Sequence, residues 1–318
     1  MTTTLITGGT GFIGAEIARQ FAAKGAERPV LFDLFPAPVR LGADADAYTI
    51  LKGDLGNFSH VLDAVSTTRP DTIFHLGGML SVPCEKDPAA GIQANAMGTF
   101  HVLEAARLFG VTKVVLASTI ATYGYDLTGT QIDDRTLQRP TSLYGATKVF
   151  AENLGRFYAK KHGIDFRGVR YPSIVGPGVT TPAVVQYTSW VIERCAKGEP
   201  FTIWVEPHTK VAVMHYRDAA RAVVDGAEAP RDRIQTGVYI MGGPKPAASA
   251  AELADMVRAA IPGAVIDFDP DPAIQAIVDP LQLPLDDSRA SQEWGWRPEY
   301  DQARIIEAMI EEVRAGES

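Results

Sequence analysis

The sequence predicts an α/β protein with a doubly wound parallel sheet and a small interleaved C-terminal lobe. Three observations support this fold class. The first 170 residues alternate short apolar runs with helical patterns, a glycine-rich turn joins the first run to the first helix, and proline and glycine cluster after residue 170. Because connections between parallel strands are right-handed, such alternation places helices on both faces of one sheet.

The elements of the first half follow in order along the chain. Most of the strand candidates are continuous apolar runs, as expected for strands that are buried on both faces. We expect strands over residues 4–7, 30–32, 48–52, 72–76, 113–117 and 165–170, and helices over residues 11–24, 60–68, 92–109 and 142–162.

The second half mixes further pieces of the sheet with a lobe. We expect a helix ending near residue 196, a strand over 201–205, a helix over 219–227, a strand over 237–241, a helix over 249–260, an apolar segment at 264–268 and a final helix from 302. The predicted sheet domain is residues 1–170 with returning segments at about 211–241. Residues 171–210 and 242–318 form the predicted substrate lobe, which would cover the carboxyl ends of the strands.

Composition restricts the classes of partner. The net charge of −8 and the absence of a basic stripe argue against nucleic acid and anionic membranes. The start Met1-Thr2-Thr3-Thr4 has no basic region or cleavage site, and no apolar stretch reaches 18 residues. Cys84 and Cys195 have no metal-ligand spacing. We therefore expect a soluble, cytoplasmic protein with reduced thiols, no metal site and a small-molecule substrate.

A dinucleotide fingerprint follows the first strand. Gly8, Gly11 and Gly14 permit a tight turn, close approach of a pyrophosphate and close helix packing. The helix that opens at Phe12 and Ile13 offers amide donors to phosphates, so this half is predicted to be a Rossmann domain that binds NAD(P).

The next strand ends at a carboxylate. Asp33 stands about 20 residues after the fingerprint, where it can accept the ribose hydroxyls. Leu34 and Phe35 follow it and no arginine stands beside it, which favours NAD over NADP, although Arg40 could still fold back.

A Tyr-x-x-x-Lys pair supplies the candidate chemistry. Tyr144 and Lys148 share one helix face, and an ammonium beside a phenol favours the phenolate. Ser118 and Thr119 are expected to leave the preceding strand at its carboxyl edge, where a hydroxyl could hold a substrate oxygen or satisfy free backbone groups.

Together these motifs resemble the extended short-chain dehydrogenase/reductase superfamily of the nucleotide-sugar epimerase/dehydratase type, over essentially the whole chain. The resemblance implies Thr119 as catalytic hydroxyl, Tyr144 as base and Lys148 as its modulator. It places Asp54 and Leu55 beside the adenine. Further residues that it implies at the cofactor are Leu76, Gly77, Gly78, Asn95 and Tyr171, with Tyr144 and Lys148 themselves. It also implies a homodimer through a four-helix bundle of helices 92–109 and 142–162.

Several other stretches are similar to short-chain-type L-threonine 3-dehydrogenases. They are residues 75–81, 85–88, 170–172, 180–181, 286–290, 294–296 and 300–301. This similarity implies an NAD-dependent oxidation of a small secondary alcohol, a 3-hydroxy amino acid or a related compound. The substrate contacts that it implies are Ser81, Thr119, Tyr144, Thr180 and Thr181.

The substrate end departs from that pattern. The loop at 173–179 is shorter than in those enzymes, Pro182 replaces the usual aspartate, and Leu281 stands where a tryptophan is expected. The substrate is therefore expected to be threonine or a bulkier or less polar relative.

Two alternatives remain open. A nucleotide-sugar epimerase or dehydratase would use the same residues and keep NAD tightly bound. Val211-Ala212-Val213 stands where such enzymes commonly carry an arginine for the diphosphate, but Lys210 is adjacent and Arg217 is nearby. A non-catalytic NAD-binding protein is the other alternative.

Overall fold

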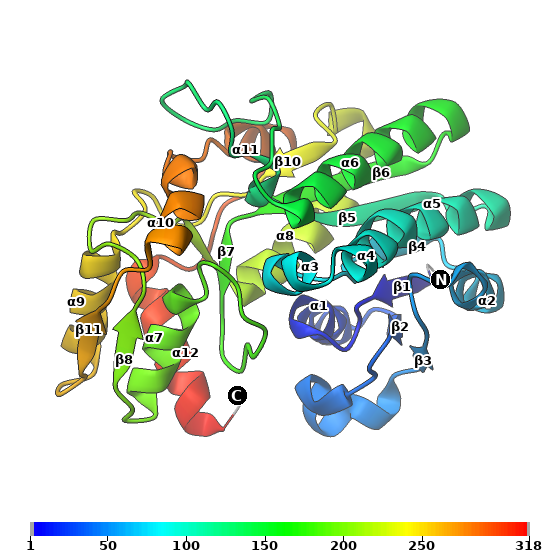
Figure 1. Ribbon diagram of the computed structural model, residues 1–318. Helices are drawn as coiled ribbons and strands as arrows, with labels where there is room; N and C mark the ends of the chain where they lie inside the picture. Colours follow the sequence, from blue (N-terminus) through cyan, green and yellow to red (C-terminus); the bar gives the residue numbers. More distant parts are fainter. Residues whose placement is uncertain (1–2, 317–318) are drawn as a thin grey trace.

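The computed structural model describes residues 3–316 and is built on a seven-stranded parallel sheet (Figure 1). Met1 and Thr2, which belong to the predicted leader-free start, lie outside the described residues. The strand order is β10-β6-β5-β4-β1-β2-β3. The strands are β1 Thr4–Thr7, β2 Val30–Asp33, β3 Ile50–Lys52, β4 Thr72–His75, β5 Lys113–Thr119, β6 Asp165–Tyr171 and β10 Val238–Ile240. The predicted doubly wound Rossmann fold is confirmed.

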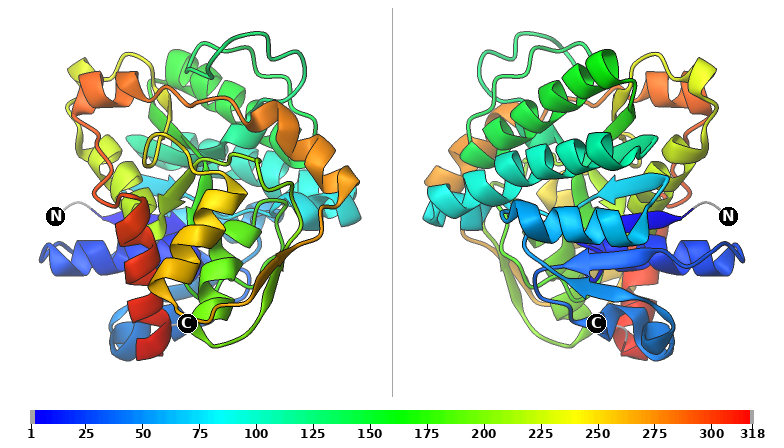
Figure 2. Two further views of the ribbon diagram at one scale, coloured as in Figure 1. Left: turned by 90° about the vertical axis from the view of Figure 1, so that its left-hand side faces the viewer. Right: turned by 90° about the vertical axis from the view of Figure 1, so that its right-hand side faces the viewer.

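Helices cover both faces of this sheet (Figure 2). Leu5 packs into the core beneath α2, α5 and α6, whereas the next residue, Ile6, packs into the core beneath α1 and α8. Because neighbouring side chains of a strand point to opposite faces, each strand needs apolar residues throughout. These helices are α1 Phe12–Ala23, α2 Phe58–Thr68, α5 Gly98–Phe109, α6 Leu143–His162 and α8 Tyr216–Glu228.

The site is positioned by the point where the strand order reverses. From β1 the chain moves through β2 and β3 to one edge, then returns to β4 and continues through β5 and β6 toward the other edge, which β10 forms. The crevice between β1 and β4 therefore opens at the carboxyl ends of the strands, where ligands of open α/β sheets bind. Thr119 and Tyr171 end β5 and β6 and are paired in register at this edge.

A second layer of structure lies beside the carboxyl ends (Figure 1, left). Its core joins α7 Tyr187–Ala196, α9 Ala250–Ala260 and α12 Gln302–Ala315 to a two-stranded sheet of β8 Phe201–Ile203 and β11 Ile266–Phe268. A second short pair connects this lobe to the sheet domain, and it consists of β7 Ser173–Val175 and β9 Val213–His215. Shorter pieces are α10 Pro272–Val278, α11 Ser288–Trp294, η4 Arg231–Arg233 and η5 Asp279–Leu281.

The segment before α5 differs from the single helix predicted over residues 92–109. Two short helices, α3 Ser81–Lys86 and α4 Pro88–Gly91, precede it, and Asp87 caps α4 through the Ala90 amide. A π-turn, η2 Ile92–Met97, then leads into α5 at Gly98. Apolar spacing does not separate a π-turn from an α-helix, because one inserted residue disturbs the pattern only locally.

The boundaries of other elements also differ from the predicted ones. β5 continues two residues beyond the predicted end, so that Ser118 and Thr119 lie within the strand and η3 Ile120–Thr122 follows. The loop after β2 contains an unpredicted 3-10 segment, η1 Pro38–Ala47. Within residues 3–316 no helix is both long and apolar enough to cross a lipid bilayer.

Candidate active site

The glycine turn after β1 has the shape that a pyrophosphate requires. Gly8 has φ +68°, and a Cβ on Gly14 would lie 2.2 Å from the Gly8 carbonyl oxygen, so the protein itself needs glycine at both positions. At Gly11 the nearest atom to such a Cβ is the same oxygen at 3.1 Å, and the other side is open. No side chain caps α1 at Gly11, which leaves the amides at Phe12 and Ile13 to phosphate oxygens. The turn fits a dinucleotide.

Asp33 is held in place by the same turn. The Thr10 hydroxyl and amide donate to Asp33 Oδ2 at 2.9 and 3.1 Å, and the Phe35 amide donates to Oδ1 at 3.3 Å. The carboxylate at the end of β2 is thus oriented before any ribose binds. Sequence reasoning missed Thr10, because its position inside the fingerprint gives no sign of a carboxylate partner.

Asn95 organises the turn after β4. Its amide oxygen accepts from the Met79 amide at 2.7 Å, and its nitrogen donates to the Met79 carbonyl at 3.0 Å and to Thr147 Oγ1 at 3.2 Å. Thr147 in turn donates to the Tyr144 carbonyl at 2.7 Å. Asn95 is buried, so it acts on the site through Met79 and Thr147 and not by an exposed face.

The other predicted cofactor residues lie around this turn. Leu55 packs against Gly77, where a Cβ would lie 2.6 Å from the leucine side chain, and Asp54 accepts from the Gly56 amide at 2.8 Å. Tyr171 ends β6, and its hydroxyl donates to the Ala219 carbonyl at 2.6 Å inside the core. Its side chain is therefore committed to packing against α8.

Tyr144, Lys148 and Thr119 are brought together at the carboxyl edge of β5. Ser142 begins α6 by accepting from the Gly145 amide at 3.1 Å, and Glu85 accepts from the Leu143 amide at 2.8 Å. These two caps fix the first turn that carries Tyr144. Lys148 Nζ lies 5.9 Å from the centre of the Tyr144 ring.

The Thr119 hydroxyl is oriented as a donor. Its oxygen accepts from the Ala121 amide at 3.1 Å, which leaves its hydrogen to point elsewhere. A hydrogen bond with Thr119 lowers the pKa of Tyr144, but burial outweighs it and raises that pKa to about 12. Tyr144 is thus a neutral phenol at pH 7 in the free protein.

The pKa of Lys148 is shifted downward, whereas that of Tyr144 is shifted upward. Burial lowers its pKa to about 8, and one of its donors binds the Ala117 carbonyl at 2.8 Å. It therefore remains predominantly an ammonium at pH 7. The arrangement places a cation beside a phenol and a hydroxyl donor, which suits proton exchange with an alcohol oxygen.

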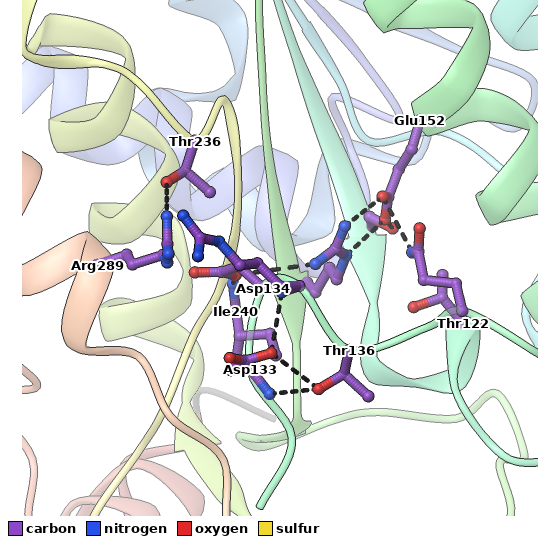
Figure 3. A network of polar contacts seen from close by, with 12 residues as sticks. Thr122, Asp133, Asp134, Thr136, Glu152, Thr236, Ile240 and Arg289 are labelled. Carbon is purple, nitrogen blue, oxygen red and sulfur yellow. Dashed lines mark hydrogen bonds and ion pairs between the residues drawn. The ribbon is translucent and has the colours of Figure 1, made fainter. Parts of the chain in front are cut away.

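A buried network of polar side chains (Figure 3) links β5, which carries Thr119, to α6, which carries Tyr144 and Lys148. Glu152, one turn beyond Lys148, accepts from Ser118 at 2.5 Å and from Arg170 at 2.9 and 2.7 Å. Ser118 is thus structural. Arg170 also donates to the Tyr123 hydroxyl at 2.8 Å and lies 3.8 Å from Asp134. The only sequence signal for Glu152 is its four-residue spacing from Lys148, which ordinarily marks an exposed helix pair.

The predicted substrate residues are less closely assembled. Ser81 opens α3, whereas Thr180 is exposed and Thr181 half-buried in the loop before α7. The structure shows no hydrogen bond from either threonine to Thr119 or Tyr144 among residues 3–316. Trp190 fixes the start of this loop by donating to the Val179 carbonyl at 2.7 Å. In the described part of the chain no three potential ligand side chains converge on a metal position.

Comparison with known proteins agrees with this geometry. The family model for the NAD dependent epimerase/dehydratase family matches residues 4–242. The mitochondrial L-threonine 3-dehydrogenase of Sus scrofa is 29% identical over 312 residues, which are 96% of this chain and 81% of the relative.

Solved structures extend the comparison. L-threonine dehydrogenase from Cupriavidus necator, in its holo form, has a TM-score of 0.90 and 28% identity over 98% of this chain and 99% of its own. UDP-glucose 4-epimerase from Thermus thermophilus in complex with NAD has a TM-score of 0.84 at 24% identity, covers 98% and 99% of the two chains, and shares the fold.

Proposed function

Because the chain belongs to the NAD dependent epimerase/dehydratase family, we propose that it is a dehydrogenase acting on the secondary alcohol of a small 3-hydroxy amino acid or a related compound. The observation that carries this proposal is the group formed by Thr119, Tyr144 and Lys148 at the carboxyl edge of β5. The full-length similarity to L-threonine dehydrogenases supports the substrate class.

The residues divide the chemistry between them. Thr119 donates to the substrate oxygen, and Tyr144 as phenolate takes the proton of that hydroxyl. Lys148 favours the phenolate through its charge. NAD would supply the hydride acceptor for the carbinol carbon and a positive charge that further favours the phenolate. Asp33 and the glycine turn hold its ribose and pyrophosphate, and Ser81, Thr180 and Thr181 hold the polar groups of the substrate.

A substrate panel tests the proposal. The purified protein is mixed with NAD and with L-threonine, other 3-hydroxy acids or amino alcohols, and NADH is followed by its absorbance. We expect NADH to form with at least one member of the panel, with NAD preferred over NADP. If no compound of the panel yielded NADH, the dehydrogenase proposal would be wrong.

The epimerase alternative makes a different prediction. Arg217, which is near in sequence to the position where epimerases commonly carry an arginine for the diphosphate, donates to the Tyr216 hydroxyl at 3.1 Å and pairs with Glu312 at 2.8 Å. The ion pair favours the dehydrogenase, because Glu312 already neutralises the Arg217 charge that a diphosphate would need. Titration calorimetry with UDP decides between the two: heat of binding would favour an epimerase or dehydratase.

The proposed domain division follows the cores. Residues 1–170 with about 211–241 form the NAD-binding domain, which is supported by pairing of β10 with β6 and packing of α8 against α1. Residues 171–210 and 242–318 form the substrate lobe, supported by the shared core of α7, α9 and α12.

The proposed assembly is a homodimer through α5 and α6. These helices lie side by side on the outer face (Figure 2, right) and expose Leu108, Phe150 and Phe157, each close to half exposed. Apolar side chains at such a face are typical of an interface. Light scattering after size exclusion measures the mass directly, and Phe157→Glu should shift a dimer to monomer.

We further propose a cytoplasmic location. Cys84 and Cys195 are both free thiols, as expected in a reducing compartment. Fractionation of cells that express the tagged protein tests this proposal.

A further inference from the structure

We propose that Arg40 is a bridging residue between cofactor and substrate sites. Its guanidinium would bind the pyrophosphate of NAD while it holds the loop at residues 176–179, which leads directly to Thr180 and Thr181. Arg40 belongs to η1, in the loop after Asp33. The inference depends on NAD binding alone and not on the identity of the substrate.

The position of the Arg40 guanidinium is the first evidence for this role. Its central carbon lies 4.9 Å from the centre of the Phe12 ring, and Phe12 is the first residue of α1. Nη1 donates to the Pro177 carbonyl at 3.3 Å, and Nη2 donates to the Gly178 carbonyl. Arg40 therefore lies between the helix terminus that receives phosphates and the loop that approaches the substrate.

The charge of Arg40 has no counter-ion of its own. No salt bridge within residues 3–316 includes it, and its half-buried side chain lies near a second cation, Arg19. The nearby carboxylate of Glu193 already pairs with Lys197 at 2.6 Å and accepts from the Gly178 amide at 3.2 Å. Because partly buried charges are normally paired, an anion is expected here, and the pyrophosphate at the start of α1 supplies one.

The loop itself is held from two sides. Gly176 packs so closely that a Cβ would lie 2.3 Å from the Phe12 ring and 2.6 Å from Tyr216, whose rings stack at 5.1 Å. From the lobe, Ser189 of α7 donates to the Gly176 carbonyl at 2.8 Å. From the cofactor side, Arg40 binds the next two carbonyls. Drawing Arg40 toward a bound pyrophosphate therefore fixes the loop as well.

Ligand binding to variants tests the phosphate contact. Calorimetry compares ADP-ribose, which contains the pyrophosphate, with adenosine, which does not. Arg40→Gln should weaken ADP-ribose binding about 10-fold or more and leave adenosine unchanged. Arg40→Lys should lie between, because it keeps the charge but not the planar fork. Arg19→Gln is the matched control, since Arg19 is paired with Glu16 at 2.7 Å.

Hydrogen exchange tests the bridge. Saturating ADP-ribose should protect the amides of residues 176 and 178–181 in the wild type, and should protect them much less in Arg40→Gln at equal saturation. Wild-type ADP-ribose affinity in Arg40→Gln would overturn the proposal, and so would full loop protection in that variant. Thermal unfolding checks that each variant is folded. If Arg40→Gln does not fold, Arg40→Lys is used in its place for both measurements. These results do not depend on whether any compound of the substrate panel yields NADH.

Discussion

In the proposed mechanism a single oxygen atom, that of the Tyr144 side chain, takes the proton of the substrate hydroxyl. Replacing Tyr144 by Phe should lower kcat about 100-fold or more, because general acid–base catalysis contributes at least that much. The affinity for NAD should fall much less than kcat, because Tyr144 is only one of the residues expected at the cofactor and the glycine turn is unchanged. Steady-state rates and NAD titration measure both quantities in the same preparation.

The matched control for this variant is Tyr125→Phe, because the Tyr125 side chain is 60% exposed and lies outside the site. This change should leave kcat and stability as they are. Equal activity of Tyr144→Phe and wild type would support the non-catalytic alternative.

The titration of the Lys148 ammonium predicts how the rate of alcohol oxidation depends on pH. The ammonium is present below its pKa of about 8 and is lost above it, whereas the Tyr144 phenolate is favoured as pH rises. Oxidation should therefore increase toward pH 8 and decline beyond it as the cation is lost. In Lys148→Arg the charge persists at all accessible pH values, so the alkaline decline should disappear even though the rate is lower. An unchanged alkaline limb in this variant would assign that limb to another group.

At the scale of elements, the strands were predictable because each is a short apolar run between turn residues. Ile73 and Phe74 in β4 face opposite cores, and this two-sided burial is what makes the run continuous. The region at 81–97 was not predictable, since Pro83 and Pro88 divide it into pieces too short for a periodic pattern. The cofactor turn was found because its glycines follow from backbone geometry that any dinucleotide requires.

The supporting residues of the site were harder to predict. Glu152 and Lys148 have the spacing of a surface pair, and only the packing of α6 against β5 and β6 buries the carboxylate. Thr10 and Glu85 likewise act through partners that are distant in sequence. Contacts of this kind depend on tertiary structure, which a local pattern does not contain.

The Glu152–Arg170 pair should be important for stability. Both side chains are at most 1% exposed, so removing Glu152 leaves the buried Arg170 cation with only the more distant Asp134 carboxylate at 3.8 Å. Glu152→Gln should lower the free energy of unfolding by about 3 kcal/mol. Adding Arg170→Met should recover part of this loss, because the orphaned cation is then removed. Urea denaturation measures the full double-mutant cycle.

The control for this cycle is a pair of the same charges on the surface. Asp255 and Arg258 form an ion pair at 2.9 Å on α9 with side chains 75% and 40% exposed. Asp255→Asn should change the free energy of unfolding little. If Glu152→Gln had as small an effect, the network behind the catalytic strand would not stabilise the fold.

At the scale of the whole molecule, the two ends of the site are built differently. The cofactor end rests on strand termini and helix caps of one sheet, whereas the residues proposed for the substrate end lie at the start of α3 (Ser81), in the loop before α7 (Thr180) and at the end of η5 (Leu281). Loops tolerate change without loss of the core. The departures from the threonine-dehydrogenase pattern therefore fall where substrate preference can change while the redox apparatus stays intact.

Two buried histidines should make the whole fold sensitive to mild acid. Burial lowers the pKa of His75 and of His215 to about 3, whereas an unfolded histidine titrates near 6.5. Between these values only the unfolded chain gains the protons, so stability falls as pH falls. Asp134 acts in the opposite direction, because burial raises its folded pKa to about 6. The net loss from pH 7 to pH 5 should be about 2 kcal/mol.

Variants assign this loss to its source. His75 lies between Thr7 and Thr99, with ring nitrogens 2.8 and 3.1 Å from their hydroxyls, and glutamine can make both hydrogen bonds without titrating. His75→Gln should therefore lower stability at pH 7 and yet lose about 2 kcal/mol less than wild type on going to pH 5. Replacing the exposed His208 by glutamine should leave the pH dependence as in wild type. Urea midpoints at pH 7, 6 and 5 measure the slopes, and parallel curves for wild type and His75→Gln would show that His75 is not held neutral by the fold.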